Sequence, residues 1–180
     1  MHQIRIHGRG GQGVVTAAEL IAIAAFNDGW QAQAFPSFGV ERTGAPIEAF
    51  ARIDKNSIRT REHVYEPNVL IIQDATLLSS IDVARGCDKK TIVIINSTLP
   101  KEKIKIKLPQ KNIFVIDATK IALEEIGKNI VNTVILGAFA KATGLVTLKS
   151  LEKAIEQKFG EKNKSLVEKN INAIRKAYNL

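Results

Sequence analysis

Cysteine occurs only once in this 180-residue chain, at Cys87. One thiol cannot form a disulfide within the chain, and it cannot hold an iron–sulfur cluster, which needs about four thiolates. The histidines, His2, His7 and His63, lack the spacing of metal ligands, and no local motif groups a serine, a histidine and an aspartate. We therefore expect no metal site and no catalytic residue on this chain, and a reducing cytoplasm as its setting.

Long apolar runs are missing as well. The apolar stretches are interrupted within a few residues, whereas a membrane span needs about 20 in succession. The start of the chain also lacks the basic segment followed by an apolar one that marks an export signal. We expect neither a membrane partner nor an exported protein.

Aromatic residues make up only 6% of the chain, whereas basic residues give it a net charge of +8. Such a charge favours nucleic acid, an acidic protein or an anionic substrate without choosing among them. The lysines are concentrated in the second half and are not interleaved with aromatic rings on which single strands could stack. We therefore expect an acidic partner protein and no nucleic acid.

The remaining composition, 45% hydrophobic and 24% charged, is that of a folded globular protein. A chain of this size buries roughly two-thirds of its extended surface, which is enough for one core and tight for two. We expect residues 1–180 to form a single domain.

The order of apolar patterns predicts an α/β fold of Rossmann-like type, with a mostly parallel sheet flanked by helices. Residues 3–7 alternate like a strand, 14–26 suit a buried helix and 31–35 suit a second strand, which together predict a βαβ unit. Further strands, each a continuous apolar run, are predicted at 69–74, 91–96 and 113–117. Further helices are predicted at 118–126 and 129–143, followed by two amphipathic C-terminal helices.

Two other segments carry β patterns. Residues 47–53 and 58–60 flank the turn-forming cluster 54–57, so they predict a β-hairpin insertion. Lysines alternate with apolar residues through 101–107, which is typical of an edge strand protected against pairing with other chains.

A glycine-rich turn, residues 8–13, lies between the first strand and the first helix. Free N–H groups and the positive end of a helix favour an anion at such a turn. The candidate cofactor-binding residues are Gly8, Gly10, Gly11, Gln12 and Gly13. A dinucleotide site also asks for an acidic residue about 20 positions on, but the second strand ends in Phe35 and Pro36. The lysine of a phosphate loop is missing too, so the turn can equally serve only close packing.

Residues 36–46 predict a loop, because they contain two glycines, two prolines and no apolar period. Rigid scaffolds often present functional side chains on such loops, and the adjacent Glu41 and Arg42 are candidates. The alternative is a solvent-facing ion pair worth under about 1 kcal/mol.

Taken together, these two segments closely resemble the gamma family of 2-oxoacid:ferredoxin oxidoreductases. The resemblance is carried by residues 8–13 with 16–20 and, more specifically, by residues 35–46. It continues through 73–78, 96–97, 117–119 and 132–138. Residues 41–46 are most similar to the pyruvate-type members.

The resemblance implies a subunit of a multi-chain enzyme that converts pyruvate, coenzyme A and oxidised ferredoxin into acetyl-coenzyme A, carbon dioxide and reduced ferredoxin, or runs the reverse synthesis. It implies no cofactor on this chain, with thiamine diphosphate and iron–sulfur clusters on partner subunits of the alpha, beta and delta types. Coenzyme A is then a substrate of the complex, and ferredoxin meets the chain only through the complex. The isolated chain is expected to be inactive.

From the composition of the loop we further expect it to form an interface or a wall of the active site. The residues concerned are Phe38, Glu41, Arg42, Thr43 and Gly44. Three other functions stay open. They are a gamma subunit for another 2-oxoacid (2-oxoisovalerate, 2-oxoglutarate or indolepyruvate), a free nucleotide-binding oxidoreductase, and a non-catalytic scaffold module.

Overall fold

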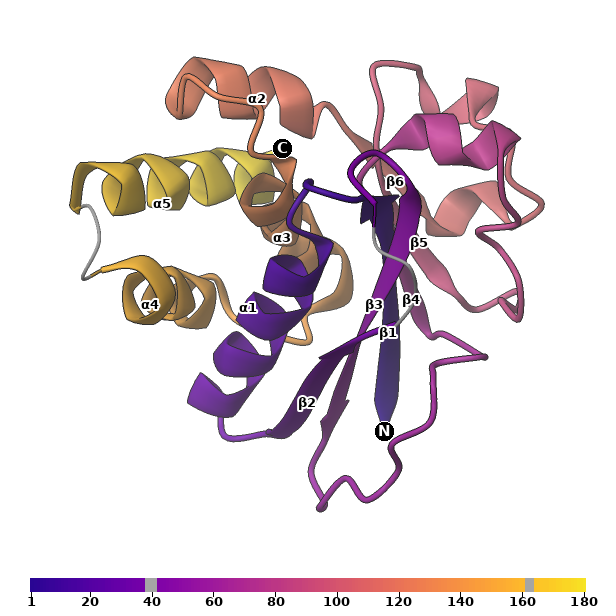
Figure 1. Cartoon of the computed structure of the whole chain (residues 1–180), viewed down its shortest axis with the longest axis horizontal. Coiled ribbons are helices and arrows are strands. Elements are labelled where there is room, and N and C mark those ends of the chain that lie inside the picture. The colour runs from indigo at the N-terminus through magenta and orange to yellow at the C-terminus, as the bar shows by residue number, and fades with distance from the viewer. Residues whose placement is uncertain (38–41, 161–163) are drawn as a thin grey trace.

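A six-stranded mixed sheet forms the centre of the computed structural model, which describes residues 1–37, 42–160 and 164–180 (Figure 1). The strands lie in the order β2-β3-β1-β4-β5-β6. Their bounds are β1 (His2–Arg9), β2 (Gln31–Pro36), β3 (Pro46–Asp54), β4 (Val69–Ile72), β5 (Ile92–Asn96) and β6 (Ile113–Ile116). β1, β4, β5 and β6 are parallel, whereas β3 is antiparallel to both of its neighbours.

Helices gather on one side of this sheet (Figure 1). They are α1 (Val14–Asn27), α2 (Ala118–Glu125), α3 (Val131–Thr143), α4 (Leu148–Phe159) and α5 (Lys164–Asn179). Their apolar sides pack with Ile6 and Ile71 of the sheet in the main core. The alternate positions, such as Leu70 and Val93, face a smaller core under the segments that join β4 to β6, because successive side chains of a strand point to opposite faces.

The predicted α/β fold class is confirmed, and so are most of its elements. The predicted strands 3–7, 31–35, 69–74, 91–96 and 113–117 correspond to β1, β2, β4, β5 and β6. The predicted helices correspond to α1, α2, α3, α4 and α5. The continuous apolar runs predicted β4, β5 and β6 correctly because burial on both faces leaves few polar positions.

The expected β-hairpin insertion is wrong. β3 covers its first arm, but residues 58–60 form no strand. Both edges of β3 are already paired, one with β1 and the other with β2, so no edge is left for a second arm. The chain beyond β3 serves another purpose, since the carbonyl groups of Glu62 and His63 accept hydrogen bonds from the buried Arg52.

The predicted βαβ unit is split. β1 and β2 run parallel and are joined through α1, but β3 lies between them in the sheet. β3 is the antiparallel strand inserted between them, and the loop that follows β2 leads into it. The end of that loop therefore lies beside the end of β1.

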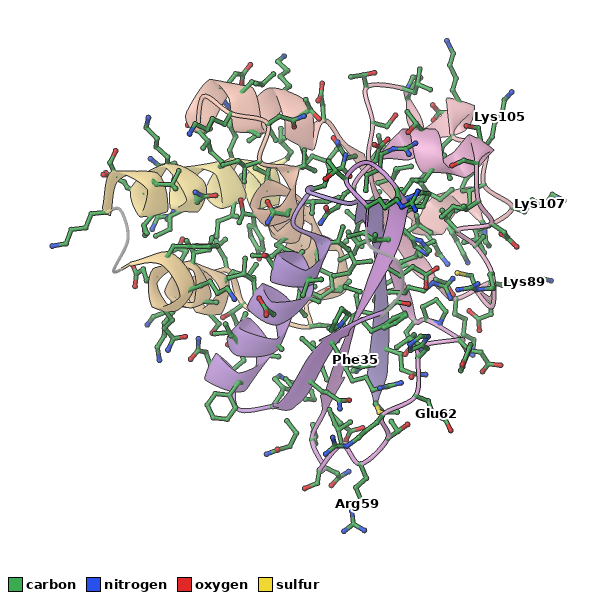
Figure 2. The ribbon with its side chains drawn as sticks, viewed as in Figure 1. Phe35, Arg59, Glu62, Lys89, Lys105 and Lys107 are labelled. Atoms are coloured by element: carbon green, nitrogen blue, oxygen red, sulfur yellow. The ribbon has the colours of Figure 1, made fainter. Side chains whose placement is uncertain are left out.

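The expected edge strand at 101–107 is also wrong. Lys101–Lys103 form a 3-10 helix, and residues 104–107 are irregular. Ile104 is buried in the smaller core, while Lys105 and Lys107 point outward (Figure 2). The alternation comes from a loop that buries one isoleucine between exposed lysines.

Candidate functional site

The glycine-rich turn is joined to the end of the loop that follows β2. Gly10, directly after β1, pairs with Thr43 in an isolated bridge. The N–H of Gly10 donates to the carbonyl of Ala45 at 2.9 Å, and the N–H of Gly44 donates to the carbonyl of Gly10 at 3.0 Å. Two separate sequence motifs therefore form one structural unit.

Two glycines of the turn are required by close approaches. A Cβ atom at Gly10 would collide with the carbonyl oxygen of Arg42. Gly13 has a φ of 70°, in the left-handed region, and a Cβ atom there would meet the side chain of Asn132 in α3. The loop and α3 can therefore both approach the turn only because these side chains are absent.

Arg9 and Asp74 form the charged centre of the site. The Nε atom of Arg9 lies 3.0 Å from Oδ2 of Asp74, and Nε2 of Gln12 donates to the same oxygen at 3.1 Å. Arg9 also donates to the carbonyl of Gly44 at 3.0 Å and to the hydroxyl of Thr76 at 2.8 Å. One side chain thereby connects the turn, the end of the loop and the segment after β4.

Asp74 is held in its ionised form. Partial burial opposes the negative charge, but hydrogen bonds from Thr76 and Gln12 and the charge of Arg9 outweigh it and lower the pKa of Asp74. Gln12 is itself oriented, because the backbone N–H of Arg9 donates to its Oε1 at 2.8 Å. A fixed carboxylate of the chain therefore lies in front of the glycine turn.

The ends of the parallel strands continue this polar edge. Asn96 donates through Nδ2 to the carbonyl of Gln73 and to the hydroxyl of Thr119, both at 3.0 Å. Its Oδ1 accepts from the backbone N–H of Thr119 at 3.2 Å. Beside these residues lies a cavity of about 190 Å³, which Gln12 and Asp74 also line.

The residues predicted to form an interface or active-site wall are only partly described. Phe38 and Glu41 lie outside the described residues. Arg42, Thr43 and Gly44 are exposed, and the backbone of Thr43 and Gly44 is held by the turn as given above. The end of the loop, just before β3, therefore presents exposed residues on a backbone that is held in place.

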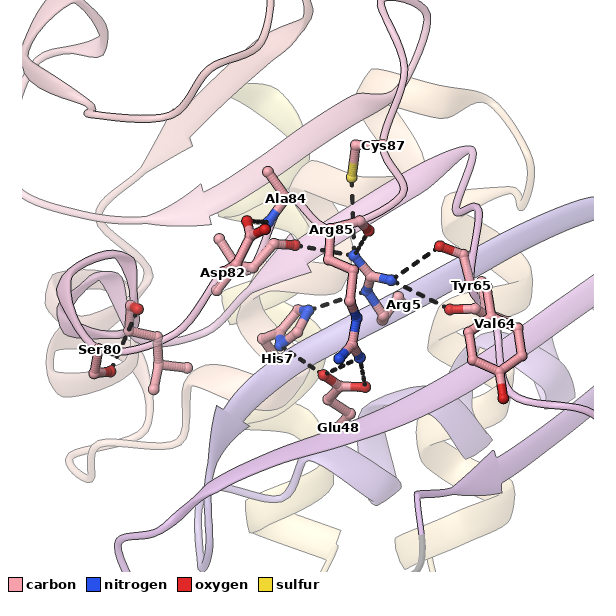
Figure 3. Close-up of polar contacts among 12 residues, drawn as sticks. Arg5, His7, Glu48, Val64, Tyr65, Ser80, Asp82, Ala84, Arg85 and Cys87 are labelled. Carbon is pink, nitrogen blue, oxygen red and sulfur yellow. Dashed lines mark hydrogen bonds and ion pairs between the residues drawn. The ribbon is translucent and has the colours of Figure 1, made fainter.

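A second polar cluster lies on the face of β1 that points away from the main core (Figure 3). Arg5 is fully buried and donates to backbone carbonyl groups of two separate segments. The acceptors are Val64, Tyr65, Val83 and Arg85. This arginine therefore holds the segments before β4 and before β5 against the sheet.

His7 belongs to the same cluster. Its Nε2 accepts a hydrogen bond from Nε of Arg5 at 3.1 Å, so the ring proton is on Nδ1, which lies 3.7 Å from Glu48. Burial, followed by the positive charges of Arg5 and Arg85, lowers the pKa of His7 to about 3. His7 is therefore a neutral structural residue at physiological pH.

Sequence reasoning assigned no role to Arg5, Arg9 or Asp74. A signal was present for Arg5 and Arg52, because each is a charged residue between apolar residues of a strand. Ile4 and Ile6 flank Arg5, and Ala51 and Ile53 flank Arg52. For Arg9 and Asp74 the partners are 65 residues apart, and no local pattern connects them.

The described ranges contain no group of three or more His, Cys, Asp or Glu side chains that could hold a metal ion. Among the described helices, none combines the length and the apolarity that a bilayer crossing requires. Burial raises the pKa of the Cys87 thiol, although the nearby Arg5 opposes this, so little of it is present as the nucleophilic thiolate.

The fold and the site define an α/β protein with a mostly parallel sheet, whose glycine turn is tied to the chain's own carboxylate and to the end of a neighbouring loop. Residues 3–180 match the family described as Pyruvate ferredoxin/flavodoxin oxidoreductase, and the chain belongs to that family. The resemblance seen in the sequence is thereby confirmed.

Individual relatives match over most of their length. "Pyruvate synthase subunit PorC" of Methanosarcina barkeri is 54% identical over 155 residues, which cover 86% of this chain and 85% of the relative. "Pyruvate/ketoisovalerate oxidoreductases common subunit gamma" of Pyrococcus furiosus is 51% identical and covers 99% of this chain and 96% of the relative. The crystal structure of pyruvate oxidoreductase subunit PORC from Thermotoga maritima matches with a TM-score of 0.83 at 37% identity. The match covers 99% of this chain and 95% of that one.

Proposed function

We propose that this chain is the gamma subunit of a cytoplasmic pyruvate:ferredoxin oxidoreductase. The observation that carries the proposal is its similarity, at 54% and 51% identity, to subunits named for pyruvate enzymes. The complete enzyme would convert pyruvate, coenzyme A and oxidised ferredoxin into acetyl-coenzyme A, carbon dioxide and reduced ferredoxin, or run the reverse synthesis.

In this proposal the chain, as one domain over residues 1–180, forms a wall of the complex and contributes none of the reacting groups. Thiamine diphosphate and the iron–sulfur clusters are assigned to partner subunits of the alpha, beta and delta types. The single cysteine of this chain could supply one of the roughly four thiolates that a cluster needs. Ferredoxin would therefore exchange electrons with the partners.

The loop that follows β2 is proposed to face those partners or the path of coenzyme A. Its end is exposed, yet its backbone is fixed by Gly10 and Arg9. A surface that is already ordered loses little conformational entropy when a partner binds. Phe38, Glu41 and Arg42 belong to the same loop and are assigned to the same contact.

The glycine turn is proposed to shape the edge of the sheet rather than to hold a dinucleotide. Arg9, Gln12 and Asp74 bond to one another in front of it. We expect calorimetry on the isolated chain to show no binding of NAD(P) or FAD at micromolar concentration. Binding at that level would favour a free nucleotide-binding oxidoreductase instead.

The main test is affinity isolation of the native complex through a tag on this chain. We expect copurified partner subunits and a reduction of ferredoxin that requires both pyruvate and coenzyme A. If none of the 2-oxoacids supported reduction of ferredoxin by the isolated complex, the chain would be a scaffold module and the proposal would be refuted.

The role of the loop has a separate test in the same preparation. The double variant Glu41→Ala with Arg42→Ala should weaken assembly or raise the KM for coenzyme A several-fold. Glu102→Ala with Lys103→Ala is the matched control, because it also removes one exposed charge of each sign from adjacent residues, at a segment distant from the loop in sequence. Equal behaviour of the two double variants would remove the loop from the interface.

A second candidate is a gamma subunit shared by two enzymes. It is favoured by the 51% identity to the Pyrococcus furiosus relative, whose name joins pyruvate with ketoisovalerate. A shared subunit predicts that the tagged chain isolates two distinct sets of partners, one of them active with 2-oxoisovalerate. The same preparation assayed with 2-oxoglutarate and indolepyruvate covers the remaining 2-oxoacids.

A further inference from the structure

The amide of Gln73 is buried without a hydrogen-bond partner. Gln73 is only 2% exposed. Neither its Nε2 nor its Oε1 forms a hydrogen bond within the described part of the chain. A buried polar group in this state destabilises the fold, because it gives up its hydrogen bonds to water and gains none in return. Such groups are uncommon in folded proteins and call for a physical explanation.

The position of Gln73 is rigid. Its backbone N–H donates to the carbonyl of His7 at 2.9 Å, and its own carbonyl accepts from Nδ2 of Asn96 at 3.0 Å. Gln73 directly follows β4, and the alternation of that strand places it on the face of Val69 and Ile71, toward the helices. The side chain lines the cavity of about 190 Å³ at the carboxyl edge of the sheet.

The neighbours of this amide are already engaged. Gln12 bonds to Arg9 and Asp74, while both polar atoms of the Asn96 amide are bonded. Of these three amides, only that of Gln73 has both its nitrogen and its oxygen unbonded within the described residues. It is therefore the amide of this cavity that is free to bond to a ligand.

The charges around the cavity favour a neutral ligand. α3 begins at its wall with Val131, and Ile130 at the N-cap offers no side-chain oxygen to the first turn, so free N–H groups and the positive end of the helix lie close by. The carboxylate of Asp74 lines the same cavity. An anion would gain from the helix but would approach the carboxylate of Asp74, whose ion-pair partner Arg9 does not line the cavity.

We propose that this cavity binds a neutral, planar carboxamide group through Gln73. The carbonyl of the ligand accepts from Nε2 of Gln73 or from the first turn of α3, and its N–H donates to Oε1 of Gln73. The cavity has room for about six waters at roughly 30 Å³ each. This volume is smaller than that of a typical small-molecule site. The cavity therefore admits a small amide or the amide end of a longer molecule.

This site does not depend on the proposed function, and its test uses the full chain alone. A ¹⁵N-labelled sample is titrated with acetamide and, separately, with acetate. With acetamide we expect saturable shifts of the Gln73 side-chain amide and of the backbone amides of Val131 and Asn132. A ligand of so few atoms should bind with a dissociation constant on the order of millimolar. Acetate should bind at least about tenfold more weakly because of Asp74.

The variant Gln73→Met keeps the volume and removes both polar atoms. It should weaken acetamide binding at least about tenfold while leaving the Tm unchanged or higher, since an unpartnered amide is lost. Gln110→Met is the matched control, because Gln110 is exposed in a 3-10 helix, and it should bind acetamide like the wild type.

Two results would overturn the proposal. Absence of a saturable shift with acetamide would mean that the cavity holds only water. Equal binding of acetate would mean that the site does not select a neutral amide. Both comparisons use the wild-type chain and so do not depend on the folding of a variant.

Discussion

Nε of Arg5 donates a hydrogen bond of 3.1 Å to Nε2 of His7, two residues further along the same face of β1. This bond fixes the imidazole as a neutral acceptor beneath a buried cation. It means that a histidine next to the glycine turn serves the folded state and is unsuited to proton transfer near neutral pH.

The first prediction concerns pH. The pKa of His7 is lowered from 6.5 to about 3 on folding, so the unfolded chain binds one more proton than the folded chain between these values. His7 therefore makes the free energy of unfolding fall by up to about 1.4 kcal/mol per pH unit as the pH drops through this window. In urea unfolding measured between pH 4 and 6.5, the free energy of unfolding of His7→Gln should fall less steeply with decreasing pH than that of the wild type. His63→Gln, at an exposed site, should keep the wild-type slope, and an equally steep slope for His7→Gln would contradict the assignment.

The second prediction concerns Arg5. Arg5→Met leaves buried carbonyl groups without a donor and should lower the free energy of unfolding by at least about 3 kcal/mol. Residues 62–65 and 82–87 should also exchange their amide hydrogens faster. Arg59→Met is the control, because Arg59 points away from the molecule (Figure 2). Equal stability of the two variants would show that the contacts of Arg5 carry little energy.

The third prediction concerns Arg9. Arg9→Met removes the hydrogen bonds to Asp74, Gly44 and Thr76 and should cost about 1–3 kcal/mol. Its distinguishing sign is faster amide exchange at Gly44, with little change in the helices. Lys120→Met breaks only the exposed 4.0 Å pair with Glu124 and should be nearly neutral. Unchanged exchange at Gly44 would mean that the backbone bonds alone hold the loop.

The fourth prediction compares neighbouring glycines. Gly10→Ala places a methyl group against the carbonyl of Arg42 and must separate the loop from the turn. Gly11→Ala meets no atom of the described residues within 4 Å, so it carries only the strain of its φ of 92°, roughly 1–2 kcal/mol. Gly10→Ala should therefore lower the Tm more than Gly11→Ala and should reduce recovery of the complex. The reverse order would indicate that the loop is not packed on the turn.

Local sequence patterns predicted an element correctly where its position in the sheet agreed with its own apolar pattern. The runs at 69–74 and 91–96 could only be buried strands, because continuous apolar residues are stable only when both faces are covered. Residues 58–60 and 101–107 also looked like strands. Residues 58–60 form none because both edges of β3 are paired. Residues 101–107 form none; they are a loop that buries Ile104 in the smaller core.

The sequence by itself determined the α/β class, the glycine turn, the family and the location of the loop, since each depends on residue types at short spacings. Only the tertiary structure decided what the turn contains. Arg9 meets Asp74 from 65 residues away, Gly10 meets the end of the loop, and the amide of Gln73 is left unpartnered beside them. Those relationships arise from strand order and from which polar atoms run out of partners on folding, and neither is written in any local stretch of the chain.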